Sequence, residues 1–357
     1  MNVRGPVLAL CALVPACAAV DYFDAELDPV EPAALLHAKT LSDAPDPAGA
    51  ITVVDWNIKF GGGRLDFFFD CHGNRGNMDK AEVHDNLAGV AAEITSLAPD
   101  ILFVEEVDRP SKRSAYVDEL QWLLDHTHLN FAAYASQWKA DFVPSDGIGR
   151  IDDGIAVLSR WPISHAQRIA LPEVGEYDAL ERYFYLKRGM LIAQVAVPGM
   201  PDGLWVVVVH TEAYSHDGTK ARQIDRFAAE LDALDRDGKR FVAGGDLNAL
   251  PPGSQKTSDF PDLVCTDQAF RDDDYAAETT LLQPLYDAWE AEIPLADYQA
   301  DNARYFSHTT DKDAFWNRKL DYLFTNGDFV DGSGEVHQQG TMPLSDHAPV
   351  SVELVVP

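Results

Sequence analysis

Basic residues, cysteines and long apolar runs are all scarce in this sequence, and each shortage bears on the class of protein. Lysine and arginine number 28 against 58 aspartates and glutamates, which leaves a formal net charge of -30. Proteins that bind nucleic acid by displacing counterions need a basic face, so that class is disfavoured. The sequence has no apolar run long enough to cross a bilayer as a helix, no collagen-like glycine period and no heptad seam. Integral membrane, collagen-like and coiled-coil proteins are therefore excluded.

The sequence does contain enough apolar residues to fold. Of its 357 residues 46% are apolar, which supports a sizeable core in one large domain or two ordinary ones. The negative charge does not exclude a metal-dependent enzyme that contacts a single phosphate, because bound cations would supply positive charge locally.

The first 17 residues have the layout of a secretory signal, in which one arginine precedes an apolar run too short to span a bilayer. The run ends in LVPAC, which resembles a bacterial lipobox, so we expect Cys17 to be lipidated and to attach the protein to a membrane. Simple secretion and an uncleaved anchor are the alternatives. The expected location is that of an exported protein, either a periplasmic or outer-membrane-associated lipoprotein or a secreted protein.

Residues 18–50 are rich in Ala, Asp and Pro and show little periodicity. This composition predicts a flexible tether, and the alternative is a terminus packed loosely on the domain. Cys11 and Cys17 belong to the export signal, which leaves Cys71 and Cys265. In an oxidising compartment these two could form a long-range disulfide, and two buried free thiols are the alternative.

Short apolar runs recur from residue 51 to the end of the sequence. β-Branched and aromatic residues predominate in them, and near-continuous apolar runs are typical of strands buried on both faces. Apolar residues at helical spacing predict helices over 79–97, 115–125 and 218–235. Because no change in composition divides this stretch, we expect one α/β domain over 51–357, in which sheets pack together and helices cover them.

Polar side chains of a few types lie at or beside the ends of these runs. The eight positions are Asn57, Glu106, His210, Asp246, Asn248, Asp321, Asp346 and His347. Ligands of α/β proteins bind where strand ends and their loops converge. We therefore expect these side chains to meet in one cleft.

The side chains of the segments GGDLNALP and SDHAPV suit phosphate chemistry. Asp246 and Asn248 are two residues apart, so on a strand they share a face, with a carboxylate to activate a nucleophile beside an amide to donate to an oxygen. A turn stabilised by the aspartate is the alternative. His347, oriented by Asp321, is a candidate general base, although a structural role is common for a single histidine.

Two adjacent acids, Glu105 and Glu106, directly follow the run DILFV. Neighbours on a strand point in opposite directions, so only one of them can face the cleft, while the other faces solvent or a helix. An acid in that position either pairs with a base or binds a cation. Oxygen ligands favour Mg²⁺ or Mn²⁺, with Ca²⁺ as a third candidate; no group of Cys and His has zinc-binding spacing, and no HExxH motif occurs.

Seven segments in order resemble the endonuclease/exonuclease/phosphatase superfamily, which includes deoxyribonuclease I, neutral sphingomyelinases and inositol-phosphate 5-phosphatases. They are VVDWNIKF, LFVEEVD, DGIAVLSRWPI, VVVVHTEA, GGDLNALP, KLDYLF and SDHAPV. Each motif alone is weak, and the ordered set is specific. The resemblance runs from Ile51 to the C-terminus and implies a four-layer α/β/β/α sandwich of two mainly antiparallel sheets with outer helices.

The resemblance also implies roles for individual residues. Glu106 would be a metal ligand, Asn57 would contact the metal or its water, and Asp346 would make a further metal contact. The other five positions would act on the phosphate and the attacking water, without a covalent intermediate.

The expected phosphate-site roles are the following. His210 binds and polarises the scissile phosphate, Asp246 and Asn248 serve the nucleophile and the phosphate, and His347 is the catalytic base with Asp321 as its partner. The sequence departs from the family pattern at Glu105, where glutamine is usual, at Thr211-Glu212 after the histidine, and at Lys319, where arginine is usual. These departures leave the substrate open.

The expected function is therefore hydrolysis of a small phosphoester or a lipid headgroup by a divalent-metal-dependent, monomeric phosphoesterase. A secreted nuclease is the alternative, and a non-catalytic adaptor on the same scaffold is less expected, because every catalytic position is filled. Basic residues in the loops, in particular Arg113 and Arg188, are candidates for contacts with the substrate phosphate. Ion pairs with the many carboxylates are the alternative for these arginines.

Overall fold

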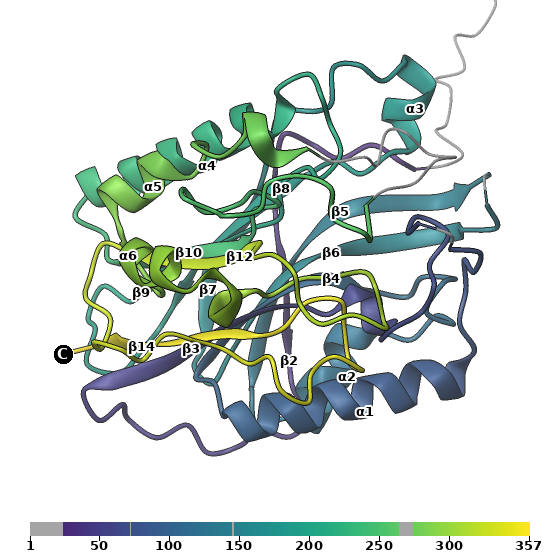
Figure 1. The fold of residues 1–357 in the computed structure, drawn as a ribbon. Helices are drawn as coiled ribbons and strands as arrows, with labels where there is room; N and C mark the ends of the chain where they lie inside the picture. Colours follow the sequence, from purple (N-terminus) through teal and green to yellow (C-terminus); the bar gives the residue numbers. More distant parts are fainter. Residues whose placement is uncertain (1–23, 72, 145, 264–273) are drawn as a thin grey trace, which may run out of the picture.

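The computed structural model describes residues 24–71, 73–144, 146–263 and 274–357. Two seven-stranded sheets pack face to face, and helices cover their outer faces (Figure 1). The first sheet has the order β1 (Val30–Pro32), β7 (Ile163–Ala170), β8 (Gly189–Val195), β9 (Leu204–Val209), β10 (Phe241–Asp246), β12 (Asp321–Thr325) and β11 (Glu290–Ala291). The second has the order β13 (Glu335–Val336), β14 (Val350–Val355), β3 (Ala50–Asn57), β4 (Ile101–Asp108), β6 (Gly149–Ser159), β5 (Phe131–Val143) and β2 (Ala34–His37).

Each sheet contains a single parallel pair among the described strands, and the other pairs are antiparallel. The parallel pairs are β9–β10 in the first sheet and β3–β4 in the second. The expected sandwich of two mainly antiparallel sheets is confirmed. The helices are α1 (Lys80–Leu97), α2 (Glu119–His126), α3 (Ala179–Phe184), α4 (Thr219–Arg236), α5 (Gln283–Ala288) and α6 (Leu295–Ala300), with 3₁₀ turns at η1 (Lys59–Gly61), η3 (Tyr275–Ala277) and η4 (Asn302–Tyr305).

The layers follow from side chains that alternate along the strands. On β3, Val53 points into the cluster between the two sheets, whereas Val54 points into the cluster shared with α1 and α2. This period of two is the property that lets one strand serve two cores. On the other side, Ile224 and Phe227 of α4 pack against the outer face of β9 and β10. The predicted helices over 79–97, 115–125 and 218–235 correspond to α1, α2 and α4.

The segment predicted as a flexible tether needs a correction. Within residues 18–50, β1 pairs with β7 and β2 pairs with β5, so that residues 30–37 extend the edges of both sheets. The prediction of a tether is wrong for these residues, and the alternative of a terminus packed on the domain describes them better. Pro32 obscured the pattern, but an edge strand tolerates proline because one side of its backbone needs no partner in the sheet.

Two sequence expectations concern positions that the structure covers only in part or not at all. The export signal over 1–17 and the lipidation of Cys17 lie outside the described residues. Cys71 is disulfide-bonded, and its expected partner Cys265 also lies outside the described residues. Among the helices that the structure describes, none combines the length and apolar character needed to cross a membrane.

Candidate active site

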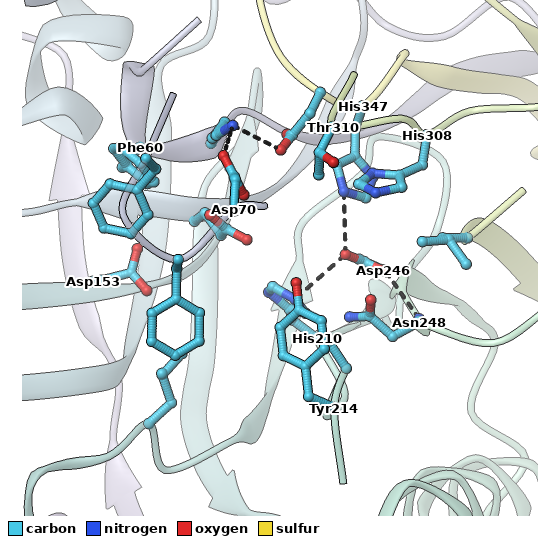
Figure 2. Close-up of a pocket in the computed structure, with 18 of the residues that line it drawn as sticks. Phe60, Asp70, Asp153, His210, Tyr214, Asp246, Asn248, His308, Thr310 and His347 are labelled. Atoms are coloured by element: carbon cyan, nitrogen blue, oxygen red, sulfur yellow. Dashed lines mark hydrogen bonds and ion pairs between the residues drawn. The ribbon is translucent and has the colours of Figure 1, made fainter. Parts of the chain in front are cut away.

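The candidate site lies where the two parallel pairs end. Asn57 is the last residue of β3, Asp246 is the last residue of β10, and His210 directly follows β9. Because the carboxyl ends of the parallel strands in both sheets meet at the same end of the sandwich, side chains from distant segments converge there. They line a central cavity, part of which is drawn in Figure 2.

A β-bulge aims Glu106 into the cavity. The register of β4 against β6 shifts between Val104 and Val107, and Glu106 adopts φ of 50°. Bulges re-aim side chains near functional sites, and a positive φ is uncommon for a residue with a Cβ. Glu106 is half-buried and lines the cavity, whereas its neighbour Glu105 is fully buried. Only one of the two acids reaches the cleft, as the sequence predicts.

The expectation that the other acid would face solvent or a helix is wrong. Glu105 points between the two sheets, where its carboxyl lies near that of Asp55 and both are fully buried. Burial, and then the nearby charge of Asp55, raise the pKa of Glu105 well above its usual range. Burial therefore favours the protonated forms of both carboxyls in the folded protein. Gly245 leaves the space for them, because a Cβ at that position would lie 3.0 Å from Oε1 of Glu105.

Asp246 is at the centre of the site. Its Oδ2 lies 3.3 Å from Nδ2 of Asn57, 3.4 Å from Nε2 of His210 and 3.6 Å from Nε2 of His347. Its Oδ1 accepts a hydrogen bond of 2.9 Å from the backbone N–H of Asn248. Asn248 adopts φ of 45° and donates through Nδ2 to the carbonyl oxygen of Thr211. Asp246 thus contacts the predicted segments that contain Asn57, His210 and His347. Asn57 in turn bonds to Glu106, and His347 bonds to Asp321, so five other predicted segments converge around Asp246.

A histidine–aspartate pair lies beside it. Nδ1 of His347 lies 2.9 Å from Oδ1 of Asp321, and Ser307 donates to the other carboxylate oxygen. Burial opposes the positive charge, but Asp321 and then Asp246 raise the pKa of His347 to about 10. Burial raises the pKa of Asp246 to about 7 against the opposing effect of His347. His210 differs, because burial and then Arg188 lower its pKa well below the usual range, so its imidazole is neutral.

The three predicted metal contacts are not equivalent. Oδ1 of Asn57 accepts a hydrogen bond from the backbone N–H of Lys59, so its amide nitrogen faces Glu106 and Asp246. Asp346 is paired with the Lys59 ammonium at 3.1 Å. Among the described residues, the carboxylate of Glu106 forms no ion pair with a lysine or arginine side chain, unlike that of Asp346. Asn57 donates to Glu106 at 3.2 Å and so orients both Glu106 and Asp246.

The donor set nevertheless fits a hard divalent cation. The carboxylates of Glu106 and Asp246 both approach the amide nitrogen of Asn57, and Glu106 is among the charges that raise the pKa of Asp246. Crowded carboxylates repel one another, and a cation bound between them relieves that repulsion. Oxygen donors are those that Mg²⁺, Mn²⁺ and Ca²⁺ prefer. Glu106 and Asp246 are the residues that would hold such an ion.

The two arginines predicted to contact the substrate phosphate also differ in how closely carboxylates of the protein compensate their charge. Arg113 is held by Asp108 at 3.0 Å and by Asp153 at 2.8 Å, so its charge is compensated within the protein. For Arg113 the alternative of an ion pair is the better description. Arg188 also lines the cavity, and its Nη1 donates to Gln137. Its Nε has no hydrogen-bond partner among the described residues and lies 4.0 Å from the Glu212 carboxylate. Arg188 therefore keeps an uncompensated donor beside the cavity.

Comparison with known proteins identifies the family. The sequence profile of the Endonuclease/Exonuclease/phosphatase family matches residues 56–347. The chain belongs to this family. Comparison with curated proteins finds no significant match.

Solved structures share the fold of this family member at low sequence identity. An endonuclease/exonuclease/phosphatase from Beutenbergia cavernae DSM 12333 is 19% identical with a TM-score of 0.57, over 86% of this chain and 72% of that one. The human Nocturnin catalytic domain with bound sulfate anion is 15% identical with a TM-score of 0.52, over 92% and 99%. A family protein from Bacteroides thetaiotaomicron is 14% identical with a TM-score of 0.53, over 86% and 98%.

The site of this family member includes two buried residues that the sequence analysis did not select. Lys59 follows Asn57 by two residues and bonds to Asp70 at 2.8 Å as well as to Asp346. His308 packs its ring against that of His347, with centroids 4.2 Å apart, and lines the cavity. A lysine inside the apolar segment WNIKF was the available signal for the first. His308 lies between apolar runs in the segment SHTT, which carried no such signal.

Proposed function

We propose that this protein is a divalent-metal-dependent phosphoester hydrolase that acts on a small phosphoester or a lipid headgroup. The observation that carries the proposal is the position of Asp246, with Asn57, His210 and His347 all within 3.6 Å of its Oδ2. A carboxylate surrounded by an amide and two imidazoles can orient a water and receive its proton while the neighbours hold a phosphate. No serine or cysteine nucleophile is required.

Each side chain has a distinct task in this proposal. When bound by Glu106 and Asp246, the cation would polarise the phosphate and offset charge on the leaving oxygen. Asp246 orients the attacking water and takes its proton. The sequence predicts His347 as the base, but in this proposal Asp246 takes that role. His347 is instead charged beside Asp321, donates from Nε2 to the phosphate and stabilises the charge that develops there. Neutral His210 donates a further hydrogen bond to a non-bridging oxygen.

The charges around the cavity favour a small substrate over a polynucleotide. Of the described lysines and arginines that line the cavity, Arg113, Arg318 and Lys59 are each bonded to at least one aspartate. Arg188 is the exception, since its nearest carboxylate lies at 4.0 Å. A nucleic-acid strand is held by a track of cations along its phosphates, whereas one phosphoester needs only one or two. The nuclease remains the alternative function.

A panel of phosphoesters tests the proposal. The purified protein is assayed with bis-p-nitrophenyl phosphate, sphingomyelin and single-stranded DNA, each with Mg²⁺, Mn²⁺, Ca²⁺ or EDTA. We expect turnover of a small diester or headgroup that EDTA abolishes and that changes little with ionic strength. Turnover of DNA that falls steeply with salt would instead support the nuclease. Equal turnover by wild-type and His347→Ala proteins would support the adaptor, with any activity assigned to a contaminant.

Export and membrane attachment form a separate proposal that rests on residues 1–17 alone. Lipidation of Cys17 would place the hydrolase at a membrane surface, where a headgroup is within reach. Labelling with palmitate in a bacterial host tests it. We expect label on the wild-type protein and none on Cys17→Ser, and label that persists on the variant would exclude lipidation at this position.

A further inference from the structure

Three buried donors lie together on the side of the cavity formed by the C-terminal segments. His308, Asp346 and His347 each offer one ligand atom, and these atoms all lie within 4.8 Å of one another. The side chains come from two segments that pair through their backbones: Thr309 N–H donates to the carbonyl of Asp346, and Ala348 N–H donates to that of Ser307. The grouping is therefore fixed by main-chain hydrogen bonds.

His308 is the member without a role in the hydrolysis proposed above. It is 7% exposed, and its buried Nδ1 has no hydrogen-bond partner among the residues that the structure describes. Leaving a buried polar nitrogen unpaired costs about 1–3 kcal/mol. A neutral imidazole carries a lone pair on one ring nitrogen, and the buried, unpaired Nδ1 of His308 can present it. A ligand that accepts this lone pair would remove the cost.

The composition of the group differs from that of the proposed Mg²⁺ position. Two imidazoles and one carboxylate are ligands typical of Zn²⁺ and other transition metals, whereas Glu106 and Asp246 offer oxygen alone. Two donors on a tetrahedral Zn²⁺ are about 3.3 Å apart, so the three donor atoms need to approach one another by up to about 1.5 Å. The Lys59 ammonium on Asp346 and the positive charge of His347 both oppose a cation. Lys59 can remain bonded to Asp70, and a metal bound at His347 would displace the proton of that ring nitrogen.

We propose that His308, Asp346 and His347 form a second cation site, specific for Zn²⁺ or a similar transition metal, whose occupation inhibits the enzyme. The inhibition rests on the proposed function. It follows because Nε2 of His347 lies 3.6 Å from Asp246 and faces the catalytic carboxylate, so a ring that binds a metal no longer serves the phosphate. The two cations would act in opposite directions, one activating and one inhibiting.

Metal binding tests the site without an assay of activity. The protein is stripped with EDTA and dialysed, then titrated with Zn²⁺ by calorimetry and with Co²⁺ by visible absorption. His308→Phe keeps a ring against His347 and removes both nitrogens. His128→Ala is the control for loss of a half-buried imidazole away from the site, since the Nε2 of His128 bonds to the carbonyl of Pro99. Circular dichroism and thermal melts establish that each variant is folded.

We expect wild-type and His128→Ala proteins to bind Zn²⁺ alike and His308→Phe to bind it at least about tenfold more weakly. Glu106→Gln should keep the Zn²⁺ affinity, and Lys59→Met should raise it. Equal affinities of wild-type and His308→Phe proteins would overturn the proposal, as would a loss of affinity in Glu106→Gln, which would place Zn²⁺ at the other position.

The inhibition is measured separately. A Zn²⁺ concentration that halves wild-type turnover in the presence of Mg²⁺ should leave the turnover of His308→Phe close to its own value without Zn²⁺. Equal inhibition of both proteins would overturn the inhibitory role. If no phosphoester is hydrolysed at all, the proposed function fails while the binding titrations still decide whether the second site exists.

Discussion

Nδ1 of His347 lies 2.9 Å from Oδ1 of Asp321, across a gap of 26 residues in sequence. Asp321 is the first residue of β12 and pairs in register with Asp246 at the end of β10. The sheet therefore holds the partner of the histidine beside the central carboxylate. The pairing of β10 with β12 thus fixes the two carboxylates that flank His347 relative to each other.

The first prediction concerns this pair. Asp321→Asn preserves the shape of the side chain but removes the negative charge that contributes most to raising the pKa of His347. We expect that pKa to fall and turnover at pH 7.5 to drop about 100-fold or more, since correct protonation and orientation of a catalytic histidine are lost together. NMR titration of His347 and steady-state kinetics measure the two effects. Unchanged turnover would remove Asp321 from the mechanism.

The second prediction concerns the buried acid at the position where the family usually has glutamine. Glu105 has a raised pKa in the folded protein, whereas the unfolded chain ionises near 4.5. Below that pH both states are protonated and Glu105→Gln should not change stability. As the pH rises above it, only the unfolded wild-type chain releases the proton, so wild-type stability falls relative to the variant.

We expect Glu105→Gln to raise the free energy of unfolding by on the order of 1–3 kcal/mol at pH 7.5 and by nothing measurable at pH 4. Urea unfolding of both proteins at the two pH values measures the difference. A stabilisation that is the same at both values would show that the carboxyl is not protonated in the folded state.

The third prediction separates the two arginines of the cavity. Arg113→Gln leaves Asp108 and Asp153 buried without a cation, which should cost about 3–5 kcal/mol of stability. Arg188→Gln removes a guanidinium whose closest carboxylate is 4.0 Å away, so stability should change little while KM rises by on the order of tenfold. Thermal melts and kinetics on the same two samples decide. A large loss of stability in Arg188→Gln together with a raised KM in Arg113→Gln would exclude Arg188 as a substrate contact.

The sequence predicted the sandwich and its polar strand ends because those features are local. Apolar runs that end in Asn57, Asp246 or His210 can be recognised without knowledge of contacts, and the order of the seven motifs indicated the sandwich fold. The helix of residues 219–236 was equally accessible, since its apolar residues Ile224, Phe227 and Leu231 recur at helical spacing and are buried as expected.

The features that the sequence did not predict depend on long-range contacts. β1 and β2 become strands only because β7 and β5 leave edges for them, and their own residues alternate weakly. Glu106 turns into the cavity because of a bulge in β4, whose position no local pattern indicates. His308 is brought against His347 by pairing of segments 39 positions apart, and Lys59 became part of the site because Asp346 and Asp70 fold around it.

Hydrolysis of bis-p-nitrophenyl phosphate by wild-type, Glu106→Gln and Asp246→Asn proteins, each measured with Mg²⁺ and with EDTA, tests most directly that a divalent cation and Asp246 act together on a phosphoester. We predict turnover for the wild-type protein that depends on Mg²⁺, a loss of about 100-fold or more in each variant, and no difference between Mg²⁺ and EDTA once Asp246 is replaced. Wild-type turnover that persists in EDTA, or that Asp246→Asn retains, would contradict this account.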